Sequence, residues 1–222
     1  TIKPVLYGSI AARLAGIHSV VNSITGRGYV FISNDAKASI LKRIARFLYR
    51  LALSHTNQAT IFENEVDRQY FIQEKLIPAE RTFLIAGVGV DTDRFTPAPE
   101  LPGTPVVLLS SRMLLDKGVG TLVEAARQLH STTPVRVALV GAPDPGNPSS
   151  ISEEQLQAWA AEGVVEYWGW QADMSATYQQ AHIVTLPTMY GEGVPTALLE
   201  AAACGRPLVA TDMPGCRDVV VD

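Results

Sequence analysis

Short apolar runs alternate with stretches of helical periodicity along the chain, and this pattern predicts an α/β protein. In the first half, apolar runs typical of buried strands occupy residues 19–24, 59–64 and 82–87. Segments with helical patterning occupy residues 7–16, 37–55 and 66–76. Because strands and helices alternate, we expect a parallel sheet with helices on both faces.

The second half repeats this alternation more regularly. Apolar runs predict strands at residues 105–111, 135–141, 164–169, 182–187 and 207–212. Helical patterns separate them at residues 118–130, 151–163, 172–181 and 195–204. Five strands with intervening helices predict a doubly wound domain, and such domains bind ligands at the carboxyl ends of their strands.

A proline-rich stretch divides the two halves. Residues 94–105, RFTPAPELPGTP, hold four prolines and a glycine, which neither a helix nor a central strand accommodates. We therefore predict a partial N-terminal domain at 1–94, a linker at 95–104 and a C-terminal domain at 105–222. The chain begins TIKPVLYGS without Met and stops soon after an apolar run. We expect a fragment that lacks N-terminal strands and a C-terminal helix.

Composition narrows the class of protein. With 47% hydrophobic and 18% charged residues among 222, the chain is globular, and its net charge of -4 argues against a general nucleic-acid binder. Cys204 and Cys216 are too few for a disulfide framework and lack the spacing of a zinc site, which favours a reducing cytosol. No apolar run reaches the length of about 18 residues expected of a membrane span.

The stretch YGEGVPTALLEAAACG, residues 190–205, holds two carboxylates eight positions apart. We predict that Pro195 occupies the first helical position, where its missing N–H costs nothing. The following N–H groups, at Thr196 and Ala197, and the positive end of the helix dipole would then attract an anion such as phosphate.

Glu200 lies one turn further along this predicted helix. Helical side chains tilt toward the N-terminus, so its carboxylate leans toward the anion site and would accept hydrogen bonds from a diol such as ribose. Glu192, on the preceding loop, would reach another part of the same ligand. The alternative is that Glu200 is an ordinary surface residue of an amphipathic helix.

Two cations, Arg112 and Lys117, flank the first strand–helix junction of the C-terminal domain, in SSRMLLDKGVGT. Together they would neutralise a diphosphate at the carboxyl edge of the sheet. Gly118 and Gly120 would allow the backbone to approach closely. The stretch is not a Walker loop, since it lacks GKS or GKT.

These segments, with SRMLLDKGV, LVGAPDPGNP, YWGWQADM and LPTMYGEGVPTALLEAAACGRPLVATDMPG in order, resemble the donor-binding domain of retaining glycosyltransferases of family four, which have the GT-B fold. The E-x7-E element of Glu192 and Glu200 is that family's signature. The first segment, from KPVLYGSIAARLAGI through VVNSITGRGYVF to LIAGVGVDTDRF, resembles the acceptor-side domain of the subgroup that builds capsules, O-antigens and lipid-linked glycans.

The resemblance implies a nucleotide-sugar donor, with UDP expected, between two Rossmann-like domains. Arg112 and Lys117 would hold the diphosphate and stabilise its departure. Glu200 would take the ribose hydroxyls and Glu192 the hydroxyls of the transferred sugar, so the catalytic residues would be Arg112, Lys117 and Glu192. The further donor-binding residues would be Gly169, Trp170, Gly193, Val194, Thr196 and Ala197. The resemblance also implies that no metal or other cofactor is needed.

The sequence departs from the family at two places. After Glu192 it reads Gly193, Val194 and Pro195, where many members have Gly-aromatic-Gly, so one backbone donor is lost. The acceptor-domain His that usually follows the strand at 19–24 is replaced by Thr-Gly-Arg-Gly, which leaves Thr25 and Arg27 as candidate acceptor contacts. His18 precedes the strand, and we expect it to pack structurally.

The predicted helix at 37–55 carries Lys42, Arg46 and Arg50 on one stripe, with Arg43 beside it. Its apolar residues on the other side are Ile40, Ile44, Phe47, Leu48 and Leu51. A basic amphipathic helix of this kind can lie at an anionic membrane surface, where each basic residue contributes about 1 kcal/mol. The alternative is an ordinary helix with its apolar face on the sheet. The subgroup's lipid-linked acceptor favours the membrane-surface helix, and together they predict a protein at the inner face of the cytoplasmic membrane.

The leading functional hypothesis is transfer of a hexose or N-acetylhexosamine to a lipid-linked or polysaccharide acceptor. A nucleotide-sugar epimerase of the same fold, or a non-catalytic nucleotide-sugar binding module, remain alternatives. A glycoside hydrolase is disfavoured, because its two carboxylates must face each other across the substrate at about 5 to 9 Å. Glu192 and Glu200 flank one helix start instead.

Overall fold

The computed structural model describes residues 2–26, 31 and 36–220. Its contacts group the chain into two compact units. The first unit comprises Thr1–Val88, Tyr190–Pro195 and Pro214–Asp218, and the second comprises Gly89–Met189, Thr196–Met213 and Val219–Asp222. The domain bounds expected from the proline-rich stretch stay a prediction.

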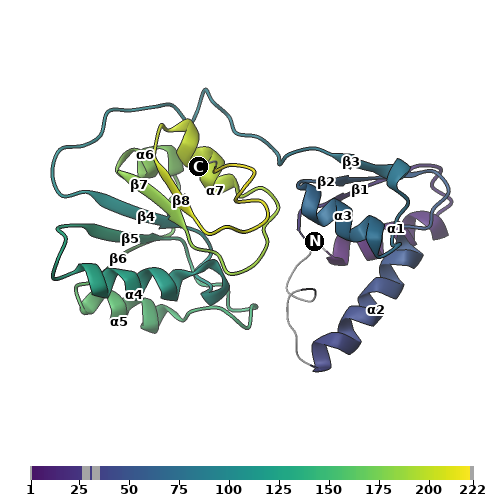
Figure 1. Cartoon of the computed structure of the whole chain (residues 1–222), viewed down its shortest axis with the longest axis horizontal. Coiled ribbons are helices and arrows are strands. Elements are labelled where there is room, and N and C mark those ends of the chain that lie inside the picture. Colours follow the sequence, from purple (N-terminus) through teal and green to yellow (C-terminus); the bar gives the residue numbers. More distant parts are fainter. Residues whose placement is uncertain (1, 27–30, 32–35, 221–222) are drawn as a thin grey trace. The chain divides into compact units, whose positions relative to one another are not determined.

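The first unit is built on a parallel three-stranded sheet of order β1-β2-β3 (Figure 1). Its strands are β1 (Val20–Ile24), β2 (Gln58–Phe62) and β3 (Thr82–Leu84). Its helices are α1 (Ile2–Leu14), α2 (Ala36–Ala52) and α3 (Glu65–Gln73). All six predicted elements are confirmed, although α1 begins five residues before its predicted start. The N-terminus of α3 is fixed by Asn64, whose side chain accepts a hydrogen bond from the Asp67 N–H at 2.8 Å.

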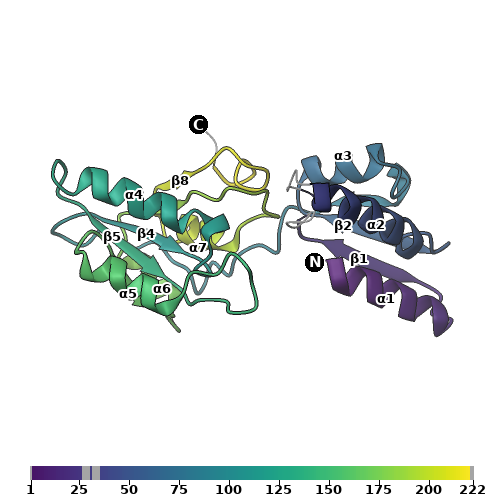
Figure 2. The same ribbon diagram turned by 90° about the horizontal axis from the view of Figure 1, so that it is seen from below.

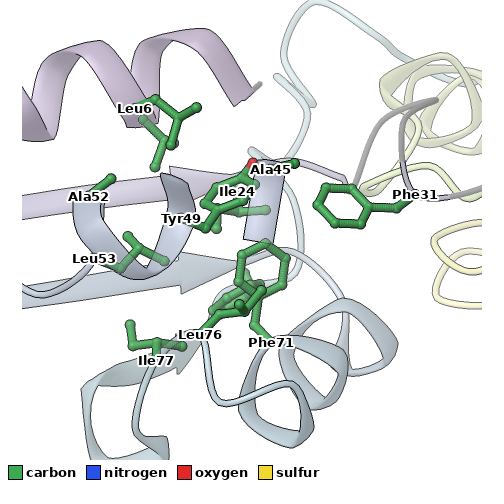
Figure 3. Packing of buried hydrophobic residues seen from close by; sticks show 12 residues of the cluster. Leu6, Ile24, Phe31, Ala45, Tyr49, Ala52, Leu53, Phe71, Leu76 and Ile77 are labelled. Carbon is green, nitrogen blue, oxygen red and sulfur yellow. The ribbon is translucent and has the colours of Figure 1, made fainter. Parts of the chain in front are cut away.

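One aromatic-rich core joins this sheet to its three helices (Figure 3). Phe71 of α3 meets Tyr49 of α2 and Phe62 of β2 edge-on, with ring centroids 5.0 and 5.1 Å away. The opposite face of the sheet presents exposed Val21 and Phe83. Helices therefore cover one face of this sheet in the described chain, and the expectation of helices on both faces is not met here.

The amphipathic helix α2 does not pack its stripe of large apolar residues against the sheet. Its small and aromatic residues Ala45, Tyr49 and Ala52 face the core. Most of its large apolar residues are exposed to solvent, namely Ile40, Leu41, Ile44, Phe47 and Leu51, whereas Leu48 packs partly against the core. The interpretation of an ordinary helix with this apolar face on the sheet is therefore wrong. None of the described helices is both long and apolar enough to cross a membrane.

The second unit is a doubly wound domain with an all-parallel sheet of order β6-β5-β4-β7-β8. Its strands are β4 (Val106–Ser110), β5 (Arg136–Val140), β6 (Glu166–Gly169), β7 (Ile183–Leu186) and β8 (Leu208–Ala210). Its helices are α4 (Val119–Leu129), α5 (Glu153–Ala161), α6 (Met174–Gln179) and α7 (Thr196–Ala203). All nine predicted elements are confirmed. The order reverses between β4 and β7, which makes this the topological switch point.

Helices cover both faces of this second sheet (Figure 2). Val137 and Leu139 of β5 pack with α4 and α5, whereas Ala138 and Val140 pack with α6 and α7. A strand buried on both sides must be apolar throughout, which explains the continuous run VALV. The hydrophobic clusters on the two faces hold all five strands parallel, so their carboxyl ends lie along the same side of the sheet.

Candidate functional site

The turn that carries Lys117 is fixed at the switch point of the second sheet. It forms a short 3-10 helix, Leu115–Lys117, between β4 and α4. The Asp116 carbonyl accepts hydrogen bonds from the Met189 N–H at 2.9 Å and the Thr188 hydroxyl at 3.2 Å, both on the loop after β7. This pairing ties the connections that follow two neighbouring strands to each other.

Gly118 makes this close approach possible. Its φ of +79° lies in the left-handed region, and a Cβ added here would stand 1.9 Å from the carbonyl oxygen of Pro187. Only glycine fits at this position. Gly120, by contrast, lies within α4, where a Cβ would meet Leu115 at 3.6 Å, an ordinary contact. Of the two glycines, Gly118 is therefore required by the fold, whereas position 120 would accept a larger residue.

Arg112 lies at the end of β4 and forms an ion pair with Asp144 of the loop after β5, at 2.6 Å. The two side chains are 56% and 34% exposed. A surface pair of this kind is worth about 0–1 kcal/mol, so an incoming phosphate can compete with Asp144 for the guanidinium. Sequence reasoning missed Asp144, although its place after a strand in the turn-rich APDPGNP gave a signal.

Gly169 and Trp170 lie at the carboxyl end of β6. The Gly169 carbonyl accepts a hydrogen bond from the Gly141 N–H, at the end of β5, at 2.8 Å. Gly169 itself has a φ of +66°, and Trp170 is 73% exposed. The ends of β4, β5 and β6 thus present a cation, a backbone turn and an exposed indole along one edge.

Helix α7 begins at Thr196, directly after Pro195, so Pro195 stands one residue before the position predicted for it. Helix ends differ by a residue or two between criteria, and the backbone N–H groups of Thr196 and Ala197 still belong to the first turn. This turn therefore has N–H groups without acceptors inside the helix, as an anion site requires.

Glu200, in the second turn of α7, is half-buried and held by Tyr178 of α6. The Tyr178 hydroxyl donates to Glu200 Oε2 at 3.2 Å. Burial raises the pKa of Glu200, while the Tyr178 hydrogen bond and the charge of Arg94 oppose that rise. Burial likewise raises the pKa of the Tyr178 hydroxyl. Within the described chain Oε1 has no hydrogen bond, so one oxygen of Glu200 remains to accept from a ligand.

Glu192, Gly193 and Val194 belong to the first unit by their contacts. The Glu192 carbonyl accepts a hydrogen bond from the Asn64 side chain at 3.1 Å, and the Val194 N–H donates to Glu63 Oε2 at 3.0 Å. A Cβ at Gly193 would stand 1.9 Å from the same Glu63 oxygen. The Val194 N–H, which the resemblance assigned to binding the nucleotide sugar, is thus hydrogen-bonded to Glu63. Sequence reasoning missed Glu63.

The acceptor-side candidates are less well placed. Thr25 follows β1 and is exposed, whereas Arg27 lies outside the described residues. His18 is exposed, so the expectation that it packs structurally is wrong. His18 lies on the connection from α1 to β1, where its ring is exposed to solvent and does not pack on the sheet.

Taken by unit, seven of the ten residues predicted to contact the donor lie in the second unit and three in the first. Those of the second unit are Arg112, Lys117, Gly169, Trp170, Thr196, Ala197 and Glu200, and those of the first are Glu192, Gly193 and Val194. Among residues 2–26, 31 and 36–220, no group of three or more His, Cys, Asp or Glu side chains is suited to hold a metal ion.

Comparison with known families identifies the C-terminal half of the chain, which holds most of the second unit. The family described as "Glycosyl transferases group 1" matches residues 104–222. The chain is 30% identical to the N,N'-diacetylbacillosaminyl-diphospho-undecaprenol alpha-1,3-N-acetylgalactosaminyltransferase of Campylobacter jejuni, over 96% of this chain and 58% of that protein. It is 26% identical to the UDP-Gal:alpha-D-GlcNAc-diphosphoundecaprenol alpha-1,3-galactosyltransferase of Escherichia coli, over 96% and 56%.

Among solved structures, the Anabaena protein HepE in complex with UDP and glucose is similar in fold. Its TM-score is 0.77 at 23% identity, covering 100% of this chain and 60% of that one. The likeness confirms the predicted α/β fold class, that of GT-B glycosyltransferases. The chain spans somewhat more than half the length of the curated relatives named above.

Proposed function

Because the chain belongs to the glycosyl transferases group 1 family, we propose that the protein containing it transfers a hexose or N-acetylhexosamine from a nucleotide sugar to a lipid-linked or polysaccharide acceptor. The transfer retains the anomeric configuration and requires no metal. The product belongs to a cell-surface glycan such as a capsule or lipopolysaccharide.

The observation that carries this proposal is the turn Asp116–Gly118. Hydrogen bonds from Thr188 and Met189 and the close contact of Gly118 with Pro187 fix this turn at the switch point of the second sheet. Ligands of doubly wound domains bind at that point. A cationic side chain on a rigid turn there suits a diphosphate, whose negative charge grows as the glycosidic bond breaks.

The other residues of this edge then take separate roles. Arg112 exchanges Asp144 for phosphate oxygens, and the first N–H groups of α7 donate to the same diphosphate. Glu200 accepts from the ribose hydroxyls through the oxygen that Tyr178 leaves open. Gly169 and Trp170 contact the base, and Glu192 the transferred sugar.

UDP is the nucleotide we assign to the donor. Two similarities support it: HepE binds UDP in its solved complex, and the E. coli relative is named for a UDP-galactose donor. Both relatives named above act on diphosphoundecaprenol-linked sugars according to their names, which supports a lipid-linked acceptor.

The exposed apolar face of α2 supports attachment to the inner face of the cytoplasmic membrane. Phe47 is 65% exposed and Ile40 64%, and basic residues flank this stripe. Residues 1–88 contain 11 Lys and Arg against 6 Asp and Glu, a charge of +5 in a chain whose total is -4. The positive charge is thus concentrated where an anionic surface would attract it.

Transfer is tested with the full-length protein, a UDP-sugar panel and an undecaprenyl-diphosphate sugar as acceptor. We expect UDP release that depends on the acceptor, and NMR of the product should show the anomeric configuration of the donor. Conversion of the donor to an epimer without acceptor would favour an epimerase instead. Donor binding with no transfer to any acceptor would indicate a binding module.

A further inference from the structure

A cavity of about 630 Å³ opens in the first unit, where α2 and α3 end. Its floor includes Leu53, Leu76 and Ile77, which are 2–3% exposed and belong to the core (Figure 3). These residues connect α2 to β2 and α3 to β3, so the cavity lies at the amino ends of the strands. It is therefore separate from the carboxyl edge of the same sheet.

Three basic side chains line this cavity: Arg50, Lys75 and Arg81. Arg50 donates to the Glu74 carbonyl at 2.9 Å, and Arg81 donates to the His55 carbonyl at 2.9 Å. These bonds fix both guanidinium groups in place. Within the described residues, none of the three cations forms an ion pair with a carboxylate.

Helix ends offset only part of this charge. The C-termini of α2 and α3 each carry about half a negative charge, so together they balance about one of the three cations. About two positive charges remain beside an apolar floor. Unbalanced cations in one concave site favour an anionic ligand, and Arg and Lys are the usual partners of phosphate.

Lys75 has an unfavourable backbone conformation. The chain leaves α3 through a Schellman turn, in which the Leu76 N–H donates to the Phe71 carbonyl and the Lys75 N–H to the Ile72 carbonyl, both at 2.9 Å. This turn puts Lys75 at φ +54°, a position that favours glycine. A lysine at this position therefore places a cationic side chain beside the cavity at a cost in backbone strain.

The exposed face of α2 indicates where the anion comes from. Arg50, which lines the cavity, is three residues after exposed Phe47, so these two side chains are neighbours on the surface of α2. A free phosphate ion gains nothing from contact with an apolar floor, whereas a lipid headgroup has glycerol and methylene groups beside its phosphate that can pack on it.

We propose that this cavity binds the phosphate headgroup of an anionic membrane lipid, with Arg50, Lys75 and Arg81 as its partners. The inference rests on the membrane attachment proposed above and makes it specific: α2 inserts its apolar stripe while the cavity at its end takes one headgroup.

Vesicle binding tests the proposal, with vesicles of phosphatidylcholine alone and of phosphatidylcholine mixed with phosphatidylglycerol. Lys75→Gly removes the ammonium group and suits the backbone, so it folds at least as well as the wild type. We expect it to weaken binding to the mixed vesicles about tenfold or more, because a charged hydrogen bond is lost. Lys75→Arg should retain binding, and Lys3→Gln, a matched loss of charge on α1, should change it by less than about twofold.

Equal losses for Lys75→Gly and Lys3→Gln would overturn the proposal, because attraction would then be diffuse. Binding of sn-glycerol 3-phosphate by a chain that binds neither vesicle would identify a free phosphate ligand and also overturn it. Phe47→Asp tests the apolar stripe separately and should release the protein from both vesicles. A UDP titration of the same samples reports the donor site, so failure at the membrane is distinguishable from failure of the transferase assignment.

Discussion

The half-buried carboxylate of Glu200 links stability to the proposed ribose contact. Its pKa is raised by burial above the ordinary 4.5, so the folded state holds the proton more tightly than the unfolded state. Stability is therefore lost as pH rises from about 4.5 through the raised pKa, and the loss is complete above it. Burial of this carboxylate in its charged form therefore lowers the free energy of unfolding, at a residue that the proposed ribose contact needs.

Replacing Glu200 with Gln removes this cost. We expect thermal unfolding of Glu200→Gln at a higher temperature than the wild type at pH 7, with the difference vanishing near pH 4. The same variant should bind UDP about tenfold or more weakly, because a charged acceptor is lost. A wild type that is stabilised by raising the pH through this range, relative to the variant, would contradict the assignment.

The Arg112–Asp144 ion pair predicts that Asp144 competes with the donor phosphate for Arg112. Since an exposed pair contributes at most about 1 kcal/mol, Asp144→Asn should tighten UDP binding by up to about fivefold in calorimetry. Glu162→Gln, which removes the surface partner of Arg127, is the matched control and should leave UDP binding unchanged. Weaker binding by Asp144→Asn would mean that Asp144 orients Arg112 instead of competing for it.

Single residues also show what the sequence could not predict. Arg112 and Asp144 are 32 positions apart, and Tyr178 lies 22 before Glu200, so neither pairing leaves a local pattern. Parallel strands allowed the common edge to be predicted, because their carboxyl ends must coincide. Which side chains meet across that edge depends on loop conformation, which periodicity does not encode.

Among the elements, the turn Asp116–Gly118 is the one whose geometry the proposed chemistry requires. Gly118→Ala would place a methyl group against the Pro187 carbonyl at a left-handed φ, and should cost at least about 2 kcal/mol in the free energy of unfolding. Gly120→Ala, in a helix with room for it, should instead stabilise by about 0.5–1 kcal/mol. Denaturant titration of both variants checks this; equal effects would contradict the close approach.

The end of α3 gives a second prediction on this scale. Relief of the left-handed backbone at Lys75 should make Lys75→Gly more stable than Lys75→Ala by about 1 kcal/mol, measured by urea unfolding. Both variants remove the same charge, so the difference isolates the backbone. No difference would show that Lys75 is not held at positive φ.

Helix α2 shows where periodicity stops being sufficient. It carries two stripes that suit burial, one of large apolar residues around Phe47 and one around Tyr49. The sheet takes the Tyr49 stripe, since small Ala45 and Ala52 let the helix lie close and Tyr49 fills the core. The helix itself was predictable from sequence, but its orientation needed the packed structure.

At the scale of the molecule, residues 1–88 are positively charged and the remainder is negatively charged, which fits separate functions for the two units. Under the proposed function, the first unit would meet an anionic membrane and its lipid-linked acceptor, while the second would bind the nucleotide sugar through a few local cations. Family membership is carried by residues 104–222, and the chain spans 58% of its C. jejuni relative.

The most direct measurement for the central claim is a calorimetric titration of UDP into the chain and two variants. We predict saturable binding that Lys117→Ala weakens about tenfold or more, because a phosphate partner on a fixed turn is lost. Lys3→Ala, on α1, should bind as the wild type does. UDP binding that Lys117→Ala leaves unchanged would contradict the donor site at the switch point of the second sheet.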